Sequence, residues 1–533
     1  MSEMGQKLIR RYGELKADRA NWESHWQDIA EFVLPNTDFT TAKEPGAERR
    51  QRIFNNTPGE ALERLVGGMG SLLTNQSLKW FDLSIRNLVS SDEGARWLSQ
   101  GRDRTLAILN DPEVNLYATL DECYESLGGF GTGVVYVENE VGLKFRSVPL
   151  SSCYIAESYM GMVDTLYRKL ELTVRQAIQM FGEESLPGKI QDELRATSDT
   201  DRVLGRTEVF IHCVGPREDY DPTSPFAFNK PFYSVTVHES TKEVVKESGF
   251  DRFPYFVPRW RRSSGEKYGR SPGIKLLQDI RVLNAVSKSA LSAASKEADP
   301  PVQMPDSGFL RPARLGPGGL NIYRSSSQGR IEPIQTGARS DRAYAIIERV
   351  EERIRQGFYN DMFHMPEIDR MTATEVLQRQ QQNQQLFSPT LNRLFVELLN
   401  PIVFEGYDYA TRVGAIEPPP EGLEDRPIEV HYTSPLARAQ KASEMGSFLE
   451  WFGALAPMAE IDPSVMDNIH PDRTARRLGH AVSLPEQMSR SDAELAEVRQ
   501  QRAQQQQEAQ QMQQAVDGAG ALKDAAQGIS ALR

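Results

Sequence analysis

A long helix in the middle of the chain sets the strongest limit on its fold. Ser271 followed by Pro272 is typical of a helix N-cap with proline at the first helical position, and Asp299-Pro300-Pro301 ends the pattern. At ~1.5 Å per residue, a helix over 272–298 would be ~40 Å long. From Ala285 onward it is rich in serine and alanine and has few large side chains. We therefore expect it to pack closely against neighbouring helices rather than to form a thick core.

The start of this helix also matches the G-x-S-x-G pattern of a hydrolase nucleophile elbow, in Gly269-Arg270-Ser271-Pro272-Gly273. An elbow needs a buried apolar strand before the serine and a backbone N–H just after it to stabilise the oxyanion. Pro272 has no N–H, and the preceding "RWRRSSGEKYG" is too charged for a buried strand. A serine hydrolase that uses Ser271 is disfavoured on both counts and is kept as an alternative.

The sequence offers little else for catalysis. Its seven histidines occur singly, without an H-E-x-x-H pattern, and Cys123, Cys153 and Cys213 lack C-x-x-C spacing. The glycine-rich residues 128–133 run into a predicted strand and no lysine follows them, which argues against a phosphate-binding loop. We expect no enzyme, no cofactor and no bound metal ion.

The charge of the chain limits its partners. Its formal net charge is -12, which argues against a protein that grips nucleic acid over a large basic surface. It does not exclude a protein that lets DNA pass without holding it. No apolar run approaches the ~20 residues that a membrane span needs, so no membrane partner is expected.

The remaining pattern predicts an α+β chain that is mainly helical. An amphipathic helix is expected over 7–34, broken only at Arg19, and a second one starts at a capping box of Thr57 and Glu60. Between 114 and 260, runs of β-branched and aromatic residues predict strands.

The second half of the chain is predicted to be largely helical. Residues 302–337 are rich in proline and glycine and separate the first long helix from a second one over 341–359. The tail over 491–533 is dominated by glutamine and alanine, and is either a helix that needs partners or a disordered end.

In this order, the segments resemble the bacteriophage portal proteins, the head-to-tail connectors of short-tailed, T7-like phages. The likeness covers nearly the whole chain and is weakest in the last ~40 residues, where low complexity makes similarity uninformative. The stretches that carry it are "RANWESHWQDIAEFVLPNTDFT", "NTPGEALERLVGGMGSLLTNQSLKWFDL", "FRSVPLSSCYIAESYMGMVDTLYRKLELTVRQAIQMFG", "FPYFVPRWRRSSGEKYGRSP" and "MTATEVLQRQQQNQQLFSPTLNRLFVELLNPI".

The resemblance implies a ring, usually of twelve identical subunits, at one capsid vertex of the virion, assembled in the host cytoplasm. Double-stranded DNA enters and leaves through its channel without sequence-specific contacts. The implied partners are the capsid and scaffolding proteins, a terminase that drives packaging, and the tail adaptor or nozzle proteins that replace it. The alternative is a structural or scaffold protein of the virion that is not a portal.

The resemblance also implies how such a portal-type fold divides along the chain. The implied parts are a wing (1–270), a first stem helix (271–300), a clip (301–340), a second stem helix (341–360), a tunnel loop (361–373), a long wing helix with its return (374–430), a crown (431–490) and the C-terminal tail (491–533).

The resemblance and the physics of DNA together suggest site residues. DNA carries one negative charge per ~1.7 Å of axis, so a strongly basic channel would bind it tightly and hinder its passage. One lysine per subunit of a ring instead forms a sparse circle of positive charge. We therefore expect Lys288 or Lys296, and Arg281, to line the stem channel, although ion pairs between helices within the stem are an alternative role for each. The further candidates are His364, Met365, Arg370 and Met371 in the tunnel loop, and Arg311 and Arg314 for clip contacts with motor or adaptor.

Overall fold

The computed structural model of the chain divides into two compact units, described here one at a time. Unit 1 is Met1–Trp80 with Arg104–Ala415, and unit 2 is Phe81–Asp103 with Ile416–Arg533. The structure describes residues 3–37, 39–40, 52–85, 92–139, 142–196, 200–221, 224, 226–305, 314, 318–323, 332–333, 340–362, 389–420, 422–423, 426–432, 451, 453, 474, 495, 498–502 and 504.

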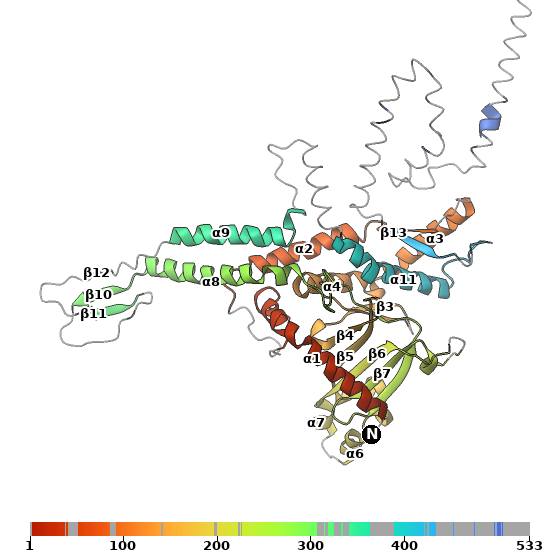
Figure 1. Cartoon of the computed structure of the whole chain (residues 1–533), viewed down its shortest axis with the longest axis horizontal. Coiled ribbons are helices and arrows are strands. Elements are labelled where there is room, and N and C mark those ends of the chain that lie inside the picture. Colours follow the sequence, from red (N-terminus) through yellow and green to blue (C-terminus); the bar gives the residue numbers. More distant parts are fainter. Residues whose placement is uncertain are drawn as a thin grey trace, which may run out of the picture. The chain divides into compact units, whose positions relative to one another are not determined.

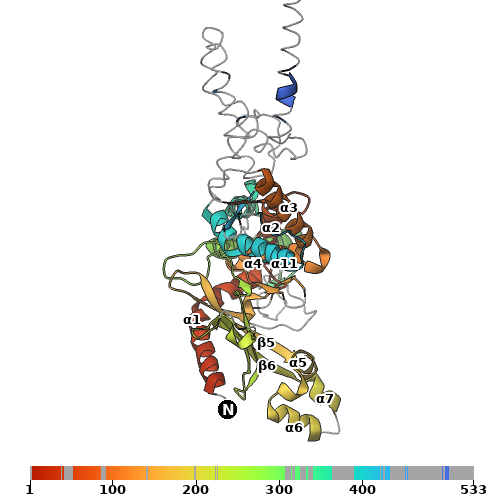
Figure 2. The ribbon, with the colours of Figure 1, turned by 90° about the vertical axis from the view of Figure 1, so that its right-hand side faces the viewer.

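The centre of unit 1 is a five-stranded antiparallel sheet in the order β4-β5-β6-β7-β8. Its strands are β4 (Cys153–Glu157), β5 (Val163–Thr173), β6 (Thr207–Pro216), β7 (Phe232–His238) and β8 (Val244–Phe250). Successive side chains of a strand point to opposite faces, so Ile211 and Phe210 belong to two different cores. The first core lies under α1 (Glu3–Phe32), and the second lies under α5 (Val174–Phe181), α6 (Gly188–Ala196) and α7 (Thr200–Gly205), as Figure 2 shows.

The apolar stripe of α1 is continuous through Arg19, where the sequence predicted a break. Arg19 is buried, and its guanidinium donates to the carbonyl oxygens of Leu150 at 3.1 Å and Cys153 at 2.7 Å. It also forms an ion pair with Glu23 and lies 3.8 Å from the centroid of the Tyr154 ring. The charge is tolerated inside the stripe because carbonyl groups next to the first strand of the sheet satisfy it.

A smaller sheet, in the order β3-β2-β9, contains β2 (Val135–Glu138), β3 (Lys144–Ser147) and β9 (Tyr255–Phe256). The helix α4 (Leu116–Phe130) packs against β3, within the region where the sequence predicted strands, and α2 (Thr57–Leu73) packs against α4. The expected Thr57–Glu60 capping box does not form. The N-cap is Asn56, and the backbone N–H of Thr57 donates to the side-chain oxygen of Asn55 at 2.9 Å.

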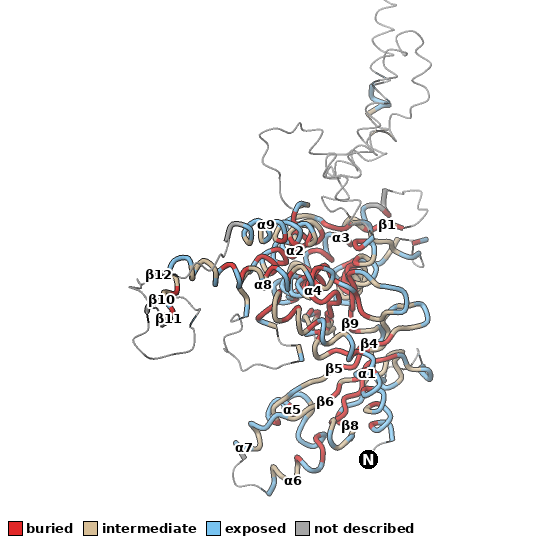
Figure 3. Tube along the Cα trace, turned by 60° about the vertical axis from the view of Figure 1, so that its left-hand side comes forward, coloured by how far each residue is buried: buried red, intermediate tan, exposed pale blue. Residues whose placement is uncertain are grey.

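Two long helices lie side by side and extend away from this core (Figure 1). They are α8 (Pro272–Ala298), which confirms the helix predicted over 272–298, and α9 (Ser340–Gly357). The buried residues of α8 end at Ala290, so its last two turns leave the core, as Figure 3 shows. A small sheet of β10 (Val302–Pro305), β11 (Leu320–Tyr323) and β12 (Glu332–Pro333), in the order β11-β10-β12, lies beyond that end.

The last helix of unit 1 contains a π-helical turn, η6 (Phe395–Leu399), directly before α11 (Asn400–Arg412). Pro401 explains the turn because it has no N–H to donate to the carbonyl of Glu397 four residues earlier. The 3-10 helices are η1 (Pro112–Val114), η2 (Leu150–Ser152), η3 (Glu183–Ser185), η4 (Ala227–Asn229) and η5 (Asn360–Met362).

In unit 2, β1 (Phe81–Ile85) pairs antiparallel with β13 (Ile428–Tyr432). The helix α3 (Asp92–Leu109) begins in this unit, and its Trp97 indole N–H donates to the carbonyl of Glu417 at 2.8 Å. Both units mix helices and strands, which confirms the mixed class that the sequence predicted. No helix among the described residues is both long enough and apolar enough to span a bilayer.

Candidate functional site

Ser271 is a helix cap and not a nucleophile. Its side chain is buried, and its hydroxyl donates to the carbonyl of Gly129 at 2.6 Å while accepting the backbone N–H of Ile274 at 2.8 Å. Its backbone is extended, with φ -84 and ψ 165, and Pro272 follows in the first turn. Because the hydroxyl is buried and has both partners, the structure removes the hydrolase alternative that rested on this residue.

The chain approaches α8 through a very close backbone contact. The N–H of Gly269 donates to the Thr132 hydroxyl at 2.9 Å, and the N–H of Trp260 donates to the carbonyl of Gly131, also at 2.9 Å. A Cβ atom on Gly269 would lie 2.1 Å from that same Gly131 oxygen, so only glycine fits there. These contacts fix the start of α8 on the end of α4.

A short segment before α2 lies across both long helices. The side chain of Asn284 on α8 accepts the N–H of Phe54 at 2.7 Å and donates to the carbonyl of Arg52 at 2.8 Å. The side chain of Asn55 donates to Glu351 on α9 at 2.7 Å. We call residues 52–57 the strap, because it joins α8 and α9 through side-chain hydrogen bonds to both.

Arg281 and Lys288 each contact the N-terminal part of their own subunit. Arg281 forms an ion pair with Asp28 of α1, and its side chain is 42 % exposed. The ammonium group of Lys288 lies 5.3 Å from the ring centroid of Phe54 in the strap. This ion pair joins α8 to α1, whereas the alternative role predicted from the sequence was an ion pair between helices of the stem.

The flank of α8 opposite its buried stripe is exposed and mostly small or polar. Helix periodicity places residues three and four apart on one face. Lys296, half-buried in the last turn, continues this face, whereas Arg281 and Lys288 lie at its edge. Lys275 has the same spacing but was not among the residues predicted from the sequence. The exposed members are Lys275, Gln278, Val282, Ala285, Ser289 and Ser292.

Of the remaining predicted site residues, the structure describes Arg314. It is exposed, and its backbone carbonyl accepts from the side chain of Asn321 on β11 at 2.7 Å. The other candidates, Arg311, His364, Met365, Arg370 and Met371, lie outside the described residues. Nearly all of the predicted crown and tail lies outside them too.

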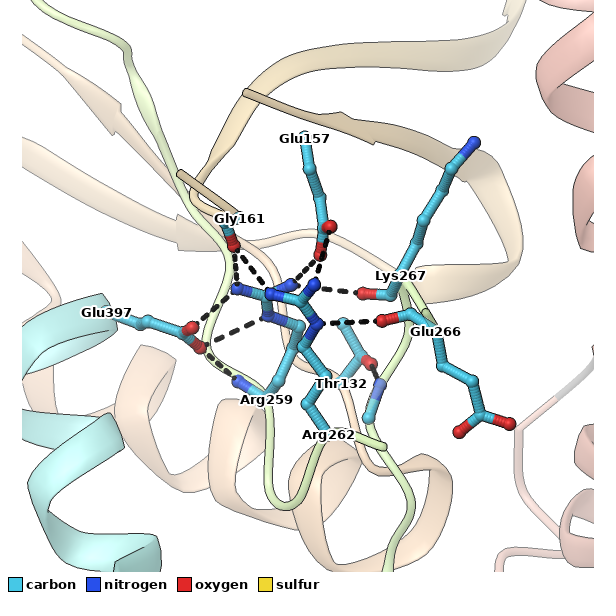
Figure 4. Close-up of polar contacts among 9 residues, drawn as sticks. Thr132, Glu157, Gly161, Arg259, Arg262, Glu266, Lys267 and Glu397 are labelled. Carbon is cyan, nitrogen blue, oxygen red and sulfur yellow. Dashed lines mark hydrogen bonds and ion pairs between the residues drawn. The ribbon is translucent and has the colours of Figure 1, made fainter. Parts of the chain in front are cut away.

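Arg259, which was not predicted from the sequence, forms a dense set of side-chain hydrogen bonds and ion pairs in unit 1. It is 1 % exposed, and Figure 4 shows its guanidinium between Glu157 and Glu397. It pairs with Glu397 at 2.6 Å and with Glu157, and it donates to the carbonyl of Gly161 at 2.9 Å. Arg262 donates to the same carbonyl at 3.1 Å.

This cluster joins three parts of unit 1. Glu157 ends β4, Glu397 lies in the π-helical turn, and Arg259 lies on the segment that leads from β9 to α8. Two carboxylates and several carbonyls satisfy a charge that would otherwise be costly to bury. The arrangement is mechanical rather than catalytic, because its donors and acceptors are occupied by one another.

The buried titratable groups also lack the features of an active site. Burial, together with Arg168 and Lys246, lowers the pKa of His212 to about 4, and its ring nitrogens lie 2.9 Å from the hydroxyls of Tyr255 and Ser234. Burial raises the pKa of the Cys153 thiol to about 11. Among the described residues, no group of three or more histidine, cysteine, aspartate or glutamate side chains could hold a metal ion.

Comparison with known proteins identifies the family. The chain is 31% identical over 512 residues to the "Probable portal protein" of Bordetella phage BPP-1, covering 93% of this chain and 91% of that one. It is 27% identical to the "Portal protein" of Salmonella phage epsilon15, covering 94% and 91%. It is 24% identical to the "Portal protein" of Escherichia phage T7, covering 87% and 85%.

A family model leads to the same assignment as these relatives and matches nearly the whole chain. The model described as "Bacteriophage head to tail connecting protein" matches residues 5–489. That family consists of structural connectors, which agrees with the expectation that the chain is not an enzyme. The chain belongs to the family of bacteriophage head to tail connecting proteins.

Proposed function

We propose that this chain is a portal protein, which forms a ring at one vertex of a phage capsid. Genomic DNA would enter through the ring during packaging and leave through it at ejection. The observation that carries this proposal is the match of nearly the whole chain to the connector family and to portal proteins of several phages.

The architecture of unit 1 supports this proposal. The pair α8 and α9 extends from the core and ends in the β10–β12 sheet, as expected for a stem of paired helices that carries a clip. We assign the stem to 271–300 and 341–360, the clip to 301–340 and the wing to 1–270 and 374–430. The tunnel loop (361–373), the crown (431–490) and a barrel or disordered tail (491–533) complete the proposed subunit.

The channel is proposed to guide DNA weakly. The chain has a net charge of -12, so a ring of such chains repels DNA broadly, and a few circles of cations would offset this repulsion locally. We keep Lys288 or Lys296, together with Arg281, as the proposed source of these circles. The exposed flank of α8 adds Lys275 as a further cation on the face that Lys296 continues.

The proposed partners follow from the same role. A ring of about twelve subunits would contact capsid and scaffolding proteins, dock a terminase, and later bind tail adaptor proteins. We propose that Arg311 and Arg314 contact the motor or the adaptor, and that His364, Met365, Arg370 and Met371 approach the DNA. The virion would be its final location.

Electron microscopy of the purified full chain, with its mass measured in solution, tests the proposal. Rings with a central hole and a mass near twelve chains are expected. A compact monomer or dimer that persists over a wide concentration range would contradict the portal function and favour a virion protein of another kind.

A further inference from the structure

The turn between β4 and β5, residues 158–162, has its backbone fixed by hydrogen bonds while two of its side chains are exposed to solvent. Arg259 and Arg262 both donate to the carbonyl of Gly161 (Figure 4). The N–H of Ser158 donates to the carbonyl of Met162 at 2.8 Å. Gly161 has φ +79, a conformation that L side chains rarely adopt. The buried Arg259 and the half-buried Arg262 therefore fix this turn in one shape.

The side chains that the turn presents are large and apolar. Tyr159 is 95 % exposed and Met160 is 73 % exposed. An exposed turn gains nothing in water from two such side chains, whereas aromatic residues held in one conformation are the usual anchors of protein interfaces. Because the turn is already ordered, a partner would lose little entropy in binding it.

Two adjoining hollows lie beside this turn. The first has a volume of about 260 Å³, and its mainly apolar lining includes Met162, Phe253 and the 52 % exposed Val396. The second has a volume of about 450 Å³ and shares Arg252 and Glu405 with the first. The surface therefore has a projection with an open depression next to it.

A second apolar projection adjoins the other hollow. Phe226 and Phe228 are stacked, with ring centroids 5.3 Å apart and planes at 12°, and both are at least half exposed. Ala227 between them lines the second hollow and packs so closely on Gly249 that a Cβ there would lie 2.1 Å from the Ala227 oxygen. This loop too is fixed in place while its aromatic rings remain uncovered.

The charges around the hollows are balanced. Lys230 pairs with Asp251 at 2.6 Å, and Arg252 pairs with Asp408. Arg259 and Glu397 of the first hollow pair with each other, and Arg412 and Glu405 contact the two ends of the Asn139 side-chain amide. A site for DNA needs surplus cations to neutralise phosphates, and this surface has none, so its chemistry favours a protein.

We propose that this surface binds a second copy of the chain. We call it the apolar face and define it by Tyr159, Met160, Met162, Phe226, Phe228 and Val396. The proposal rests on the proposed ring, in which each subunit has a permanent neighbour at a fixed place. Permanent interfaces are more apolar than transient ones, which fits the exposed side chains of this face, and they gain from parts that are ordered before contact.

A charge placed on the exposed turn tests the proposal. In Tyr159→Asp, the fraction of chains found in rings is expected to fall at least tenfold at a fixed concentration, measured by mass photometry of the full chain. Because Tyr159 makes little contact with its own subunit, far-ultraviolet circular dichroism and the melting temperature of the separated subunit should not change. The matched control is Met180→Asp, a 56 % exposed residue of α5 that lines neither hollow, and it should assemble normally.

A photo-crosslinking amino acid at position 159 identifies the occupant. The proposal expects adducts at multiples of the chain mass in purified rings. It is overturned if Tyr159→Asp assembles like the wild type, or if the adduct in virions joins only a different polypeptide. If the wild-type chain forms no ring at all, the proposed function fails before any variant is compared, so the two failures are distinguishable.

Discussion

At the scale of single residues, the partners of a side chain decide its role. Ser271 lies in a pattern that also occurs in hydrolases, yet its hydroxyl joins Gly129 to the first turn of α8. Arg19 interrupts an apolar stripe in the sequence, yet it is buried against two carbonyls. In both cases the residue type was clear from the sequence, and its hydrogen bonds were not.

Ser271→Ala should destabilise the protein without affecting any chemistry. The substitution removes an N-cap and leaves a buried carbonyl without its donor, which costs about 1–3 kcal/mol in unfolding free energy. Urea unfolding followed by tryptophan fluorescence measures the loss. Ser289→Ala, which removes an exposed hydroxyl bonded within α8, is the control and should change the unfolding free energy by less than ~0.5 kcal/mol.

His212 should make the stability depend on pH. Its pKa is about 4 in the folded protein, lower than the ordinary histidine pKa of 6.5, because burial disfavours the charged ring. The unfolded chain therefore binds more protons between these values, and the unfolding free energy should fall by roughly 3 kcal/mol as the pH decreases from 6.5 to 4. His212→Gln should flatten this slope in urea titrations at several pH values, and an unchanged slope would contradict the assignment.

At the scale of elements, the Arg259 cluster explains how distant segments hold one position. The π-helical turn at Phe395–Leu399 directs Glu397 to Arg259, which also binds the end of β4 and the turn at Gly161. The turn follows from Pro401, whose missing N–H prevents a regular helix there. The same cluster fixes the exposed turn of the apolar face.

Arg259→Met should be far more harmful than Glu397→Gln. Loss of the guanidinium leaves Glu397 buried without its cation and leaves Glu157 with Arg262 alone, at a cost of about 3–5 kcal/mol. Glutamine at 397 keeps the size of the side chain and can still accept a hydrogen bond, so its cost should be smaller. The two variants are compared by their midpoints of urea unfolding. Equal losses of unfolding free energy would show that the charge of Arg259 does not account for the stability of the cluster.

At the scale of the whole molecule, a single subunit exposes apolar surface that neighbouring subunits of the proposed ring would cover. Exposed apolar side chains lie on the apolar face and along α8 and α9, including Leu291 and Tyr344. Such surfaces are usual where neighbouring chains meet. A ring would also repeat each cation of α8 at regular intervals around the channel. The weak attraction of one cation for DNA would then be multiplied by the number of subunits.

Arg281 and Asp28 form a matched pair for testing the channel. If Arg281 lines the channel, Arg281→Gln should lower genome packaging or retention in phage complementation assays, whereas Asp28→Asn should not. Breaking the partly exposed ion pair should cost less than ~1 kcal/mol in either variant. Equal effects of the two substitutions would show that packaging depends on the Arg281–Asp28 ion pair and not on a contact of Arg281 with DNA.

The sequence alone determined the elements with strong local signals. The cap and proline at 271–272 and the prolines at 300–301 predicted α8 to the residue, and α9 lies within a few residues of its expected range. The order of segments was also sufficient to recognise the family. These features depend on short stretches of chain, where spacing and backbone chemistry decide the outcome.

Tertiary structure decided what these elements contact. The sequence did not predict the helix α4, the π-helical turn, or the meeting of Glu157, Arg259 and Glu397, which are separated by 102 and 138 residues. It also placed Arg281 and Lys288 on one face but could not show that Asp28 and Phe54 lie against them. Local patterns determine a helix because its hydrogen bonds join near neighbours, whereas a buried charge is placed by whichever distant groups can satisfy it.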